Sequence, residues 1–216
     1  MNFSTPSLLA AMLAALCVSC ETTPKPNPEQ TKVLRADWVN PYPKGSYEHF
    51  TAEPTYPKTY NVFKNRDVLA STDGSNARVI IDLGLQRAVL FNGEAVAMDY
   101  PIASGKKAFP TPPGDYKIVE KLQADKRSNL YGKIYDADGN LHKKDADSTK
   151  DKVPEGGKFE GALMPYWMRL TWSGVGMHQG RVPRYPASHG CVRIPSGVAS
   201  TVFAKTELGT PVSIVP

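Results

Sequence analysis

Apolar and polar residues form short runs through the second half of the chain, and these runs predict β-strands. Residues 79–83 form a largely apolar run of the kind found in buried strands. Two further runs, 86–91 and 94–100, flank Asn92-Gly93. Because both central positions of the tightest hairpins need positive φ, this dipeptide predicts a β-hairpin. The same patterns predict further strands at 115–122, 168–172, 174–179 and 211–215.

One stretch has the spacing of a helix with a single apolar face. In 196–205, Val198, Val202 and Phe203 fall on one side. Residues 126–159 are polar and rich in turn formers, so we expect an insertion or a lid there. The whole pattern predicts a mostly β domain with one short C-terminal helix.

The first residues predict export. Residues 7–18 are an apolar run with small side chains. It is too short for a membrane-spanning helix, which needs roughly 20 residues, but typical of a signal-peptide core. Ser19 before Cys20 resembles a bacterial lipoprotein cleavage box, although Cys17 stands where Leu is usual. We therefore expect a lipid on Cys20 and a periplasmic protein anchored to the membrane; the alternative is plain cleavage nearby, which gives an unanchored periplasmic protein.

Three segments follow from these patterns. A lipoprotein-type signal peptide is expected at 1–19, and a Pro-rich tether with an aromatic N-terminal extension is expected at 20–76. The folded domain is expected at 77–216, with the polar insertion at 126–159 inside it.

The formal net charge of +5 and the pI of about 9.0 suit an acidic partner, such as a polymer that carries carboxylates or phosphates. Lysines scattered over the surface would give the same net charge without any such partner. The one lysine-rich stretch, 143–152, is interrupted by aspartates, and the chain has no dense Lys/Arg run, so no nucleic-acid partner is expected.

Of the three cysteines, only one is expected to remain free in the mature chain. Cys17 leaves with the signal peptide and Cys20 carries the lipid, so Cys191 has no partner for an internal disulfide. A lone exported thiol is either a buried, inert side chain or a residue with a chemical task.

The run Ser188-His189-Gly190-Cys191 contains the candidate chemistry. A cysteine nucleophile needs a base or a positive environment, and His178 and His189 are both candidate bases. Gly190 lets the backbone approach a substrate, so the amides near Gly190 and Cys191 are candidate oxyanion donors. No further Cys or carboxylate is spaced to bind zinc with Cys191 and His178, so neither a metal nor a cofactor is expected.

Several motifs occur together in one order along the chain. They are 177–180 and 188–193, the loop motifs 100–105 and 111–116, and the segment 164–170. Together they resemble the L,D-transpeptidase catalytic domain, also called the YkuD domain, from residue 77 to the end of the chain. The resemblance implies the β-sandwich or mixed sheet of that family.

The resemblance also implies roles for individual residues. Cys191 matches the acylated nucleophile of the family. His178 matches its base, and the backbone carbonyl of Gln179 orients the imidazole ring. Ser188 and Gly190 match the loop that positions the thiolate.

Two further residues match the substrate side of the family's pocket. His189 shapes that side, and Arg193 is expected to hold a substrate carboxylate in a bidentate contact. The spacing from His178 to Ser188 is shorter than in the commonest form of the motif.

The implied function is a peptidoglycan L,D-transpeptidase. The cysteine attacks a stem peptide, releases D-alanine and passes the acyl group to an amine of a second stem. Water as the acceptor would make the enzyme an L,D-carboxypeptidase or a hydrolase, and a lysine of a wall-anchored protein is a third acceptor. A non-catalytic wall-binding lipoprotein and a thiol redox protein are the other classes. The presence of both Cys191 and His178 argues against a non-catalytic protein. The lack of Cys-x-x-Cys outside the leader argues against a thiol redox protein.

Overall fold

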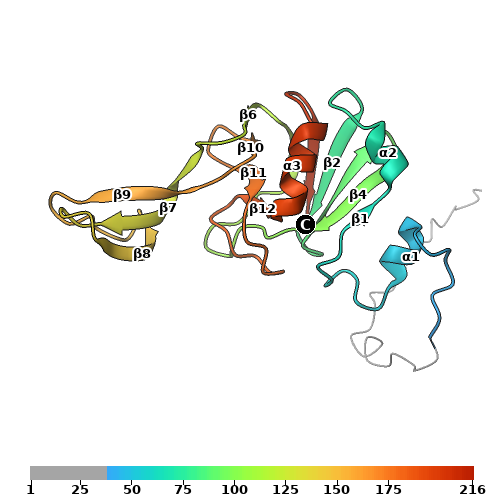
Figure 1. Ribbon diagram of the computed structural model, residues 1–216, viewed down its shortest axis with the longest axis horizontal. Helices are drawn as coiled ribbons and strands as arrows, with labels where there is room; N and C mark the ends of the chain where they lie inside the picture. The colour runs from blue at the N-terminus through green and yellow to red at the C-terminus, as the bar shows by residue number, and fades with distance from the viewer. Residues whose placement is uncertain (1–37) are drawn as a thin grey trace, which may run out of the picture. The chain divides into compact units, whose positions relative to one another are not determined.

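Three β-sheets make up most of the regular structure in residues 38–216, the part of the chain that this computed structural model describes (Figure 1). The helices and strands described belong to one unit, Asn40–Pro216. The expected signal peptide at 1–19 and the expected lipidation site at Cys20 lie outside the described residues. Among the helices described, none is both long and apolar enough to cross a membrane.

The largest sheet has six strands in the order β1-β4-β3-β2-β13-β5. They span Phe63–Lys64 (β1), Ala95–Pro101 (β4), Arg87–Asn92 (β3), Ala77–Asp82 (β2), Pro211–Val215 (β13) and Gly114–Lys117 (β5). Neighbouring strands are antiparallel, except that β13 runs parallel to β2. The strands predicted at 79–83, 86–91, 94–100 and 211–215 are therefore confirmed, with small shifts at their ends.

The predicted hairpin is present, but its turn lies one residue later than expected. Asn92 pairs with Ala95, so Gly93 and Glu94 form the loop, and in this loop only Gly93 has positive φ, +54°. Asn92 remains in β3 because the β3–β4 register shifts just before it, and its side-chain amide donates to the carbonyl of Ser71 at 3.1 Å.

The second sheet has four strands in the order β12-β11-β10-β6. They span Val192–Ile194 (β12), Gly176–Gln179 (β11), Trp167–Arg169 (β10) and Glu120–Leu122 (β6). β12 runs parallel to β11, whereas the other pairs are antiparallel. The strand expected at 115–122 is divided between β5 and β6, so this segment links the two sheets. The strand expected at 168–172 ends at Arg169, because Gly174 N–H donates to the carbonyl of Thr171 and closes a turn.

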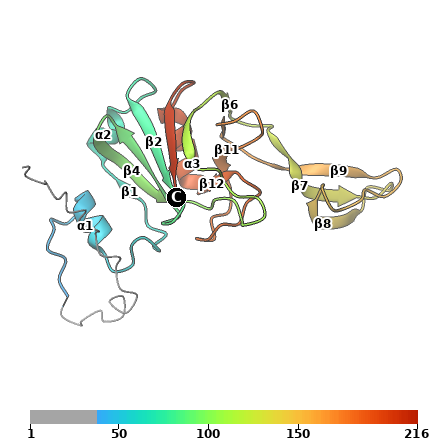
Figure 2. The ribbon, with the colours of Figure 1, turned by 180° about the vertical axis from the view of Figure 1, so that it is seen from behind.

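The main core lies between these two sheets, and α3 (Ser196–Lys205) packs into it (Figures 1 and 2). Val198 and Val202 are buried, and Phe203 packs against the same cluster, so the predicted helix and its apolar face are confirmed. Lys121 of β6 donates to the carbonyl of Phe203 at 2.6 Å and caps the end of the helix. The helix is thus tied to both sheets.

Residues 127–163 form a separate antiparallel sheet, called the arm below. Its strands are β8 (Leu141–Asp147), β7 (Arg127–Tyr135) and β9 (Lys158–Leu163), with β7 in the middle. Both views place the four-stranded sheet between the arm and the six-stranded sheet (Figures 1 and 2). Two glycines allow β7 and β9 to approach closely; a Cβ at Gly132 would lie 2.2 Å from the Glu160 carbonyl oxygen. The polar segment expected as an insertion or lid therefore has regular strand structure.

A buried ion pair fastens the described part of the N-terminal extension to β3 and β4. Arg87 and Asp99 are 1% and 0% exposed, and Nε lies 2.6 Å from Oδ1. The hydroxyls of Tyr47 and Tyr56 donate to the other Asp99 oxygen at 2.9 and 3.1 Å. Arg87 also donates to backbone carbonyls of the extension, those of Pro57, Thr59 and Asn61.

The extension has little regular structure of its own. Its helices are α1 (Tyr47–Ala52) and α2 (Arg66–Ala70). Aromatic rings of Tyr47, Phe50 and Phe63 pack against one another, with centroids 5.2 to 6.5 Å apart. Residues from Asn40 onward therefore fold together with the domain expected at 77–216.

Asp99→Ala is expected to lower the free energy of unfolding by roughly 3–5 kcal/mol, because it leaves the buried Arg87 guanidinium without its counter-charge. Glu94→Ala is the matched control. Glu94 pairs with Arg78 at 3.2 Å, but its side chain is 96% exposed, and such pairs contribute about 0–1 kcal/mol. Urea denaturation measures both losses, and equal losses would contradict the role given to the buried pair.

Candidate active site

The register of β11 and β12 brings the candidate residues to one face of the second sheet. His178 pairs directly with Arg193, and paired residues of neighbouring strands point to the same face. Cys191 lies directly before β12, two positions before Arg193, and lines the same pocket as His178 and Arg193. Met177 and Val192 point the other way and are buried in the core. The candidate nucleophile, base and carboxylate-binding residue therefore lie at one surface.

His178 is held in one orientation and one tautomer. Its Nδ1–H donates to the carbonyl of Gln179 at 2.7 Å, the contact that the resemblance implied, so Nε2 is left as a proton acceptor. The indole of Trp167 packs beside the ring, and it fits because a Cβ at Gly176 would lie only 2.5 Å from it. The side chain is largely buried, and this burial lowers the pKa of His178 to about 4.

Opposing influences act on the Cys191 thiol. Burial raises its pKa, and this effect outweighs a backbone hydrogen bond and the charges of Arg193, Lys126 and Arg169, which lower it. At pH 7 the thiol of Cys191 is thus protonated while the imidazole of His178 is neutral. At rest both groups are thus neutral rather than a thiolate and an imidazolium, and the thiol donates to the carbonyl of Gly174 at 3.5 Å.

Hydrogen bonds inside the loop 188–191 fix the position of the thiol. The hydroxyl of Ser188 donates to the carbonyl of Cys191 and accepts from the N–H of Gly190 at 3.1 Å. Gly190 has a φ of +103°, a conformation that favours glycine. Because its N–H is already committed to Ser188, Gly190 acts in positioning the loop, and the amide of Cys191 becomes the candidate oxyanion donor.

Thr111 also supports this loop, although the sequence analysis assigned it no role. Its hydroxyl donates to the carbonyl of Gly190 and accepts from the N–H of Gly105, both at 2.8 Å. A side chain at Gly105 would prevent this arrangement, because its Cβ would lie 2.1 Å from the carbonyl oxygen of Phe109. The loop motif at 111–116 was the available signal, but it did not identify a partner that lies 79 residues later.

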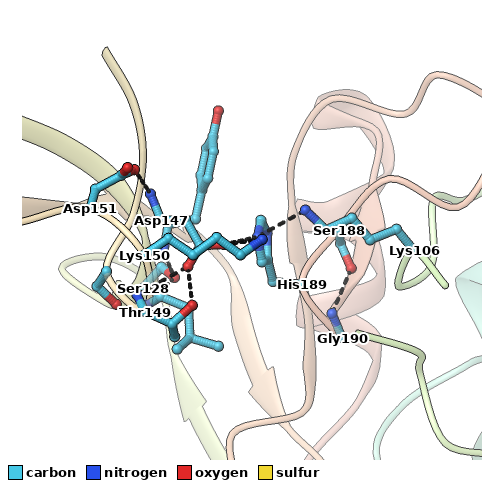
Figure 3. Close-up of polar contacts among 12 residues, drawn as sticks. Lys106, Ser128, Asp147, Thr149, Lys150, Asp151, Ser188, His189 and Gly190 are labelled. Carbon is cyan, nitrogen blue, oxygen red and sulfur yellow. Dashed lines mark hydrogen bonds and ion pairs between the residues drawn. The ribbon is translucent and has the colours of Figure 1, made fainter. Parts of the chain in front are cut away.

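The arm reaches the motif histidine, His189 (Figure 3). Nε2 of His189 lies 3.1 Å from Nζ of Lys106 and 3.5 Å from Oδ2 of Asp147, the last residue of β8. Tyr131 of β7 stacks on the same ring, with centroids 5.6 Å apart. Burial and the charge of Lys106 lower the pKa of His189 despite the opposite effect of Asp147, so its ring is neutral at pH 7. His189 therefore connects the arm to the loop 188–191.

A pocket of about 620 Å³ lies between the arm and the second sheet, and Cys191, His178, His189 and Arg193 line it. This volume is typical of small-ligand sites, which span about 300–1,000 Å³. The described lining contains no Asp or Glu, and its cationic residues are Lys126, Arg127, Arg169, Arg181 and Arg193. In residues 38–216, no group of three or more His, Cys, Asp or Glu side chains could hold a metal ion.

The neutral resting pair predicts how Cys191 reacts with iodoacetamide. Because burial raises the thiol pKa, the thiolate fraction, and with it the alkylation rate, should rise about tenfold per pH unit between pH 6 and 8. Peptide mass spectrometry measures the modification of Cys191 separately from the other cysteines. A rate that is high and constant below pH 7 would indicate a preformed ion pair and contradict this assignment.

Comparison with known proteins gives the family. The YkuD family model, the L,D-transpeptidase catalytic domain, matches residues 76–214. Solved structures with similar folds include an L,D-transpeptidase from Mycobacterium smegmatis, with 17% identity, a TM-score of 0.50, and coverage of 65% of this chain and 59% of that chain. Another is an L,D-transpeptidase mutant from Enterococcus faecium, with 26% identity, a TM-score of 0.44, and coverage of 65% and 50% respectively.

A third is the L,D-transpeptidase of Xylanimonas cellulosilytica, with 21% identity, a TM-score of 0.48, and coverage of 67% and 62% respectively. This chain thus spans less than two thirds of the length of these structures. The comparison with curated proteins found no match. Because the family model matches more than half of the 216 residues, the chain belongs to the YkuD family of L,D-transpeptidase catalytic domains.

Proposed function

We propose that the protein is a peptidoglycan L,D-transpeptidase with Cys191 as nucleophile and His178 as general base. The observation that carries this proposal is that a thiol directly before β12 and an imidazole on the adjacent β11 line one basic pocket. Family membership supports the reaction class. Stem peptides are the proposed substrates, because their carboxylates complement the positive lining.

In the first half of the reaction, Sγ of Cys191 attacks the carbonyl carbon of the third stem residue while its proton passes to Nε2 of His178. The carbonyl oxygen becomes an oxyanion, which the N–H of Cys191 stabilises. When the tetrahedral intermediate collapses, the C–N bond breaks and D-alanine leaves with the proton from His178. The acyl group remains on sulfur as a thioester.

In the second half, an amine of another stem attacks the thioester carbonyl, and His178 accepts the proton of that amine. The C–S bond breaks, the proton returns to sulfur, and a new peptide bond replaces the one that was cleaved. Water in place of the amine would give a trimmed stem. We propose an amine acceptor, and analysis of the products separates transfer from hydrolysis.

The neutral resting pair suits this proton transfer. A histidine whose pKa is about 4 is unprotonated at pH 7 and can accept the proton as sulfur bonds to carbon. The carbonyl of Gln179 stabilises the Nδ1–H of the imidazolium that forms. Arg193 is proposed to hold a carboxylate of the stem and so align its carbonyl with the sulfur.

We also propose that the enzyme is exported and held at the membrane by a lipid on Cys20, facing the periplasm. The apolar run at 7–18 and the Ser19-Cys20 box support this proposal. An anchor at one end of a Pro-rich tether would keep the domain near the membrane and allow it to reach the wall.

Cys191→Ala is expected to abolish turnover of muropeptides, and His178→Ala is expected to lower the rate by about 10² or more, the usual effect of losing a general base. His142→Ala, an exposed histidine of the arm, is the control and should retain the full rate. Mass spectrometry of the products reports cross-linked, trimmed or unchanged stems. Full activity of Cys191→Ala would remove the proposed function, and equal effects of the two histidine variants would show that the base is another residue.

Lipid labelling tests the proposed anchor. A cell grown with labelled fatty acid should incorporate the label into the wild-type protein and not into Cys20→Ser. A wild-type protein without label would show that the box with Cys17 in the Leu position does not direct lipidation.

A further inference from the structure

The cations of the pocket differ in how far their charge is already neutralised. Arg169 Nε lies 2.8 Å from a carboxylate oxygen of Glu120, and Arg127 lies 3.3 Å from Glu160. Within residues 38–216, the other three cations of the lining, Lys126, Arg181 and Arg193, form no ion pair, and Lys126 and Arg193 are the two of these whose charges act on the Cys191 thiol. Both therefore retain their positive charge for a ligand.

Lys126 and Arg193 approach the pocket from two sides. Arg193 lies on β12, on the strand that follows the nucleophile. Nζ of Lys126 lies 5.5 Å from the centroid of the Trp167 ring on β10. β10 and β12 are separated by β11, so the two sides are roughly 10 Å apart, two strand spacings. An extended peptide spans this distance with about three residues.

Both cations are held in place by their surroundings. The stem of Arg193 lies against Gly180, where a Cβ would approach its Cγ and Cδ to 3.1 Å. The backbone of Lys126 is fixed at the base of the arm, because its carbonyl accepts from the N–H of Met164 at 2.8 Å. The charge of Arg193 is thus placed before a substrate arrives, which reduces the entropy lost on binding, and Lys126 is anchored through its backbone.

These charges are not explained by activation of the thiol. Lys126 and Arg193 do favour the thiolate of Cys191, but burial outweighs them and raises the pKa of the thiol overall. A ligand with two negative groups would use both cations at once. An amide in place of a carboxylate would leave a cation desolvated and unpaired, which costs binding energy.

We propose that Lys126 is a specificity residue for a free internal carboxylate of the donor stem, while Arg193 holds a second carboxylate. This inference rests on the proposed function. The enzyme accordingly selects donor stems whose internal acidic groups are free and discriminates against stems in which they are amidated. Lys126 belongs to the junction between the arm and the second sheet, so the polar insertion contributes directly to substrate choice.

The test compares two synthetic donor tetrapeptides that differ only in one internal carboxyl group, free in one and amidated in the other, with the same terminal D-alanine. Wild-type enzyme should use the free donor with a kcat/KM about tenfold higher or more, the effect of one hydrogen bond to a charged group. In Lys126→Gln the preference should fall to about threefold or less, mainly through loss of rate on the free donor. Lys126→Arg should restore most of it.

Lys133→Gln is the matched control, because Lys133 is an exposed lysine of β7, the strand that directly follows Lys126, and lies outside the pocket lining. It should keep the wild-type preference. Equal use of the two donors by the wild type, or an equal loss on both donors in Lys126→Gln, would overturn the role of Lys126 while leaving the proposed function intact. If the wild-type enzyme consumed neither donor, the proposed function would fail and this inference with it.

Discussion

The parallel pairing of β11 with β12 is the constraint on which the candidate active site depends. In this register His178 stands beside Arg193, and Cys191, directly before β12, lines the same pocket. A slip of one residue in either strand would turn these side chains toward the core and bring Met177 or Val192 to the pocket. The buried side chains of that opposite face therefore hold the catalytic register, because a slip would expose them to water.

Burial and charge act against each other at Cys191 and in the same direction at His178. Burial favours the neutral forms of both side chains, and the surrounding cations favour a Cys191 thiolate but disfavour a charged His178. The result is a site that carries little internal charge of its own at rest but is surrounded by positive groups. Such a site would stabilise negative charge that arrives with a ligand or develops at a carbonyl oxygen.

Local patterns in the sequence were sufficient where local interactions decide the structure. The apolar spacing of α3 predicted its bounds, and the alternating runs predicted the β2–β3–β4 meander. The segment 115–122 could not be divided in this way, because long-range bonds decide it. Ile118 N–H donates to Thr210 beside the first sheet, whereas the N–H of the next residue, Val119, donates to Arg169 of the second. Adjacent residues with similar side chains thus join different sheets.

The same distinction applies to the site. The motif that contains His178 and Cys191 could be recognised in the sequence, because its residues lie close together along the chain. Lys106 and Asp147 carried no such signal, and the motif at 111–116 did not reveal the partner of Thr111, since each of these residues gains its role only by meeting a residue of the loop 188–191 in the folded protein. Two of these contacts span 79 and 83 residues.

The arm is a polar segment with a small core, and it is nevertheless folded and fixed relative to the second sheet. Its β-ladder satisfies the backbone, and of its apolar side chains Ile134 and Ala146 are fully buried. Its position relative to the second sheet depends on contacts at its base, where Asp147 and Tyr131 meet His189. Because these contacts involve His189, which belongs to the loop 188–191, the geometry of the arm and the geometry of that loop depend on each other. A change in the arm that moves His189 is therefore expected to shift the loop 188–191 that carries Cys191, whereas His178, placed by the β11–β12 register, is expected to stay where it is.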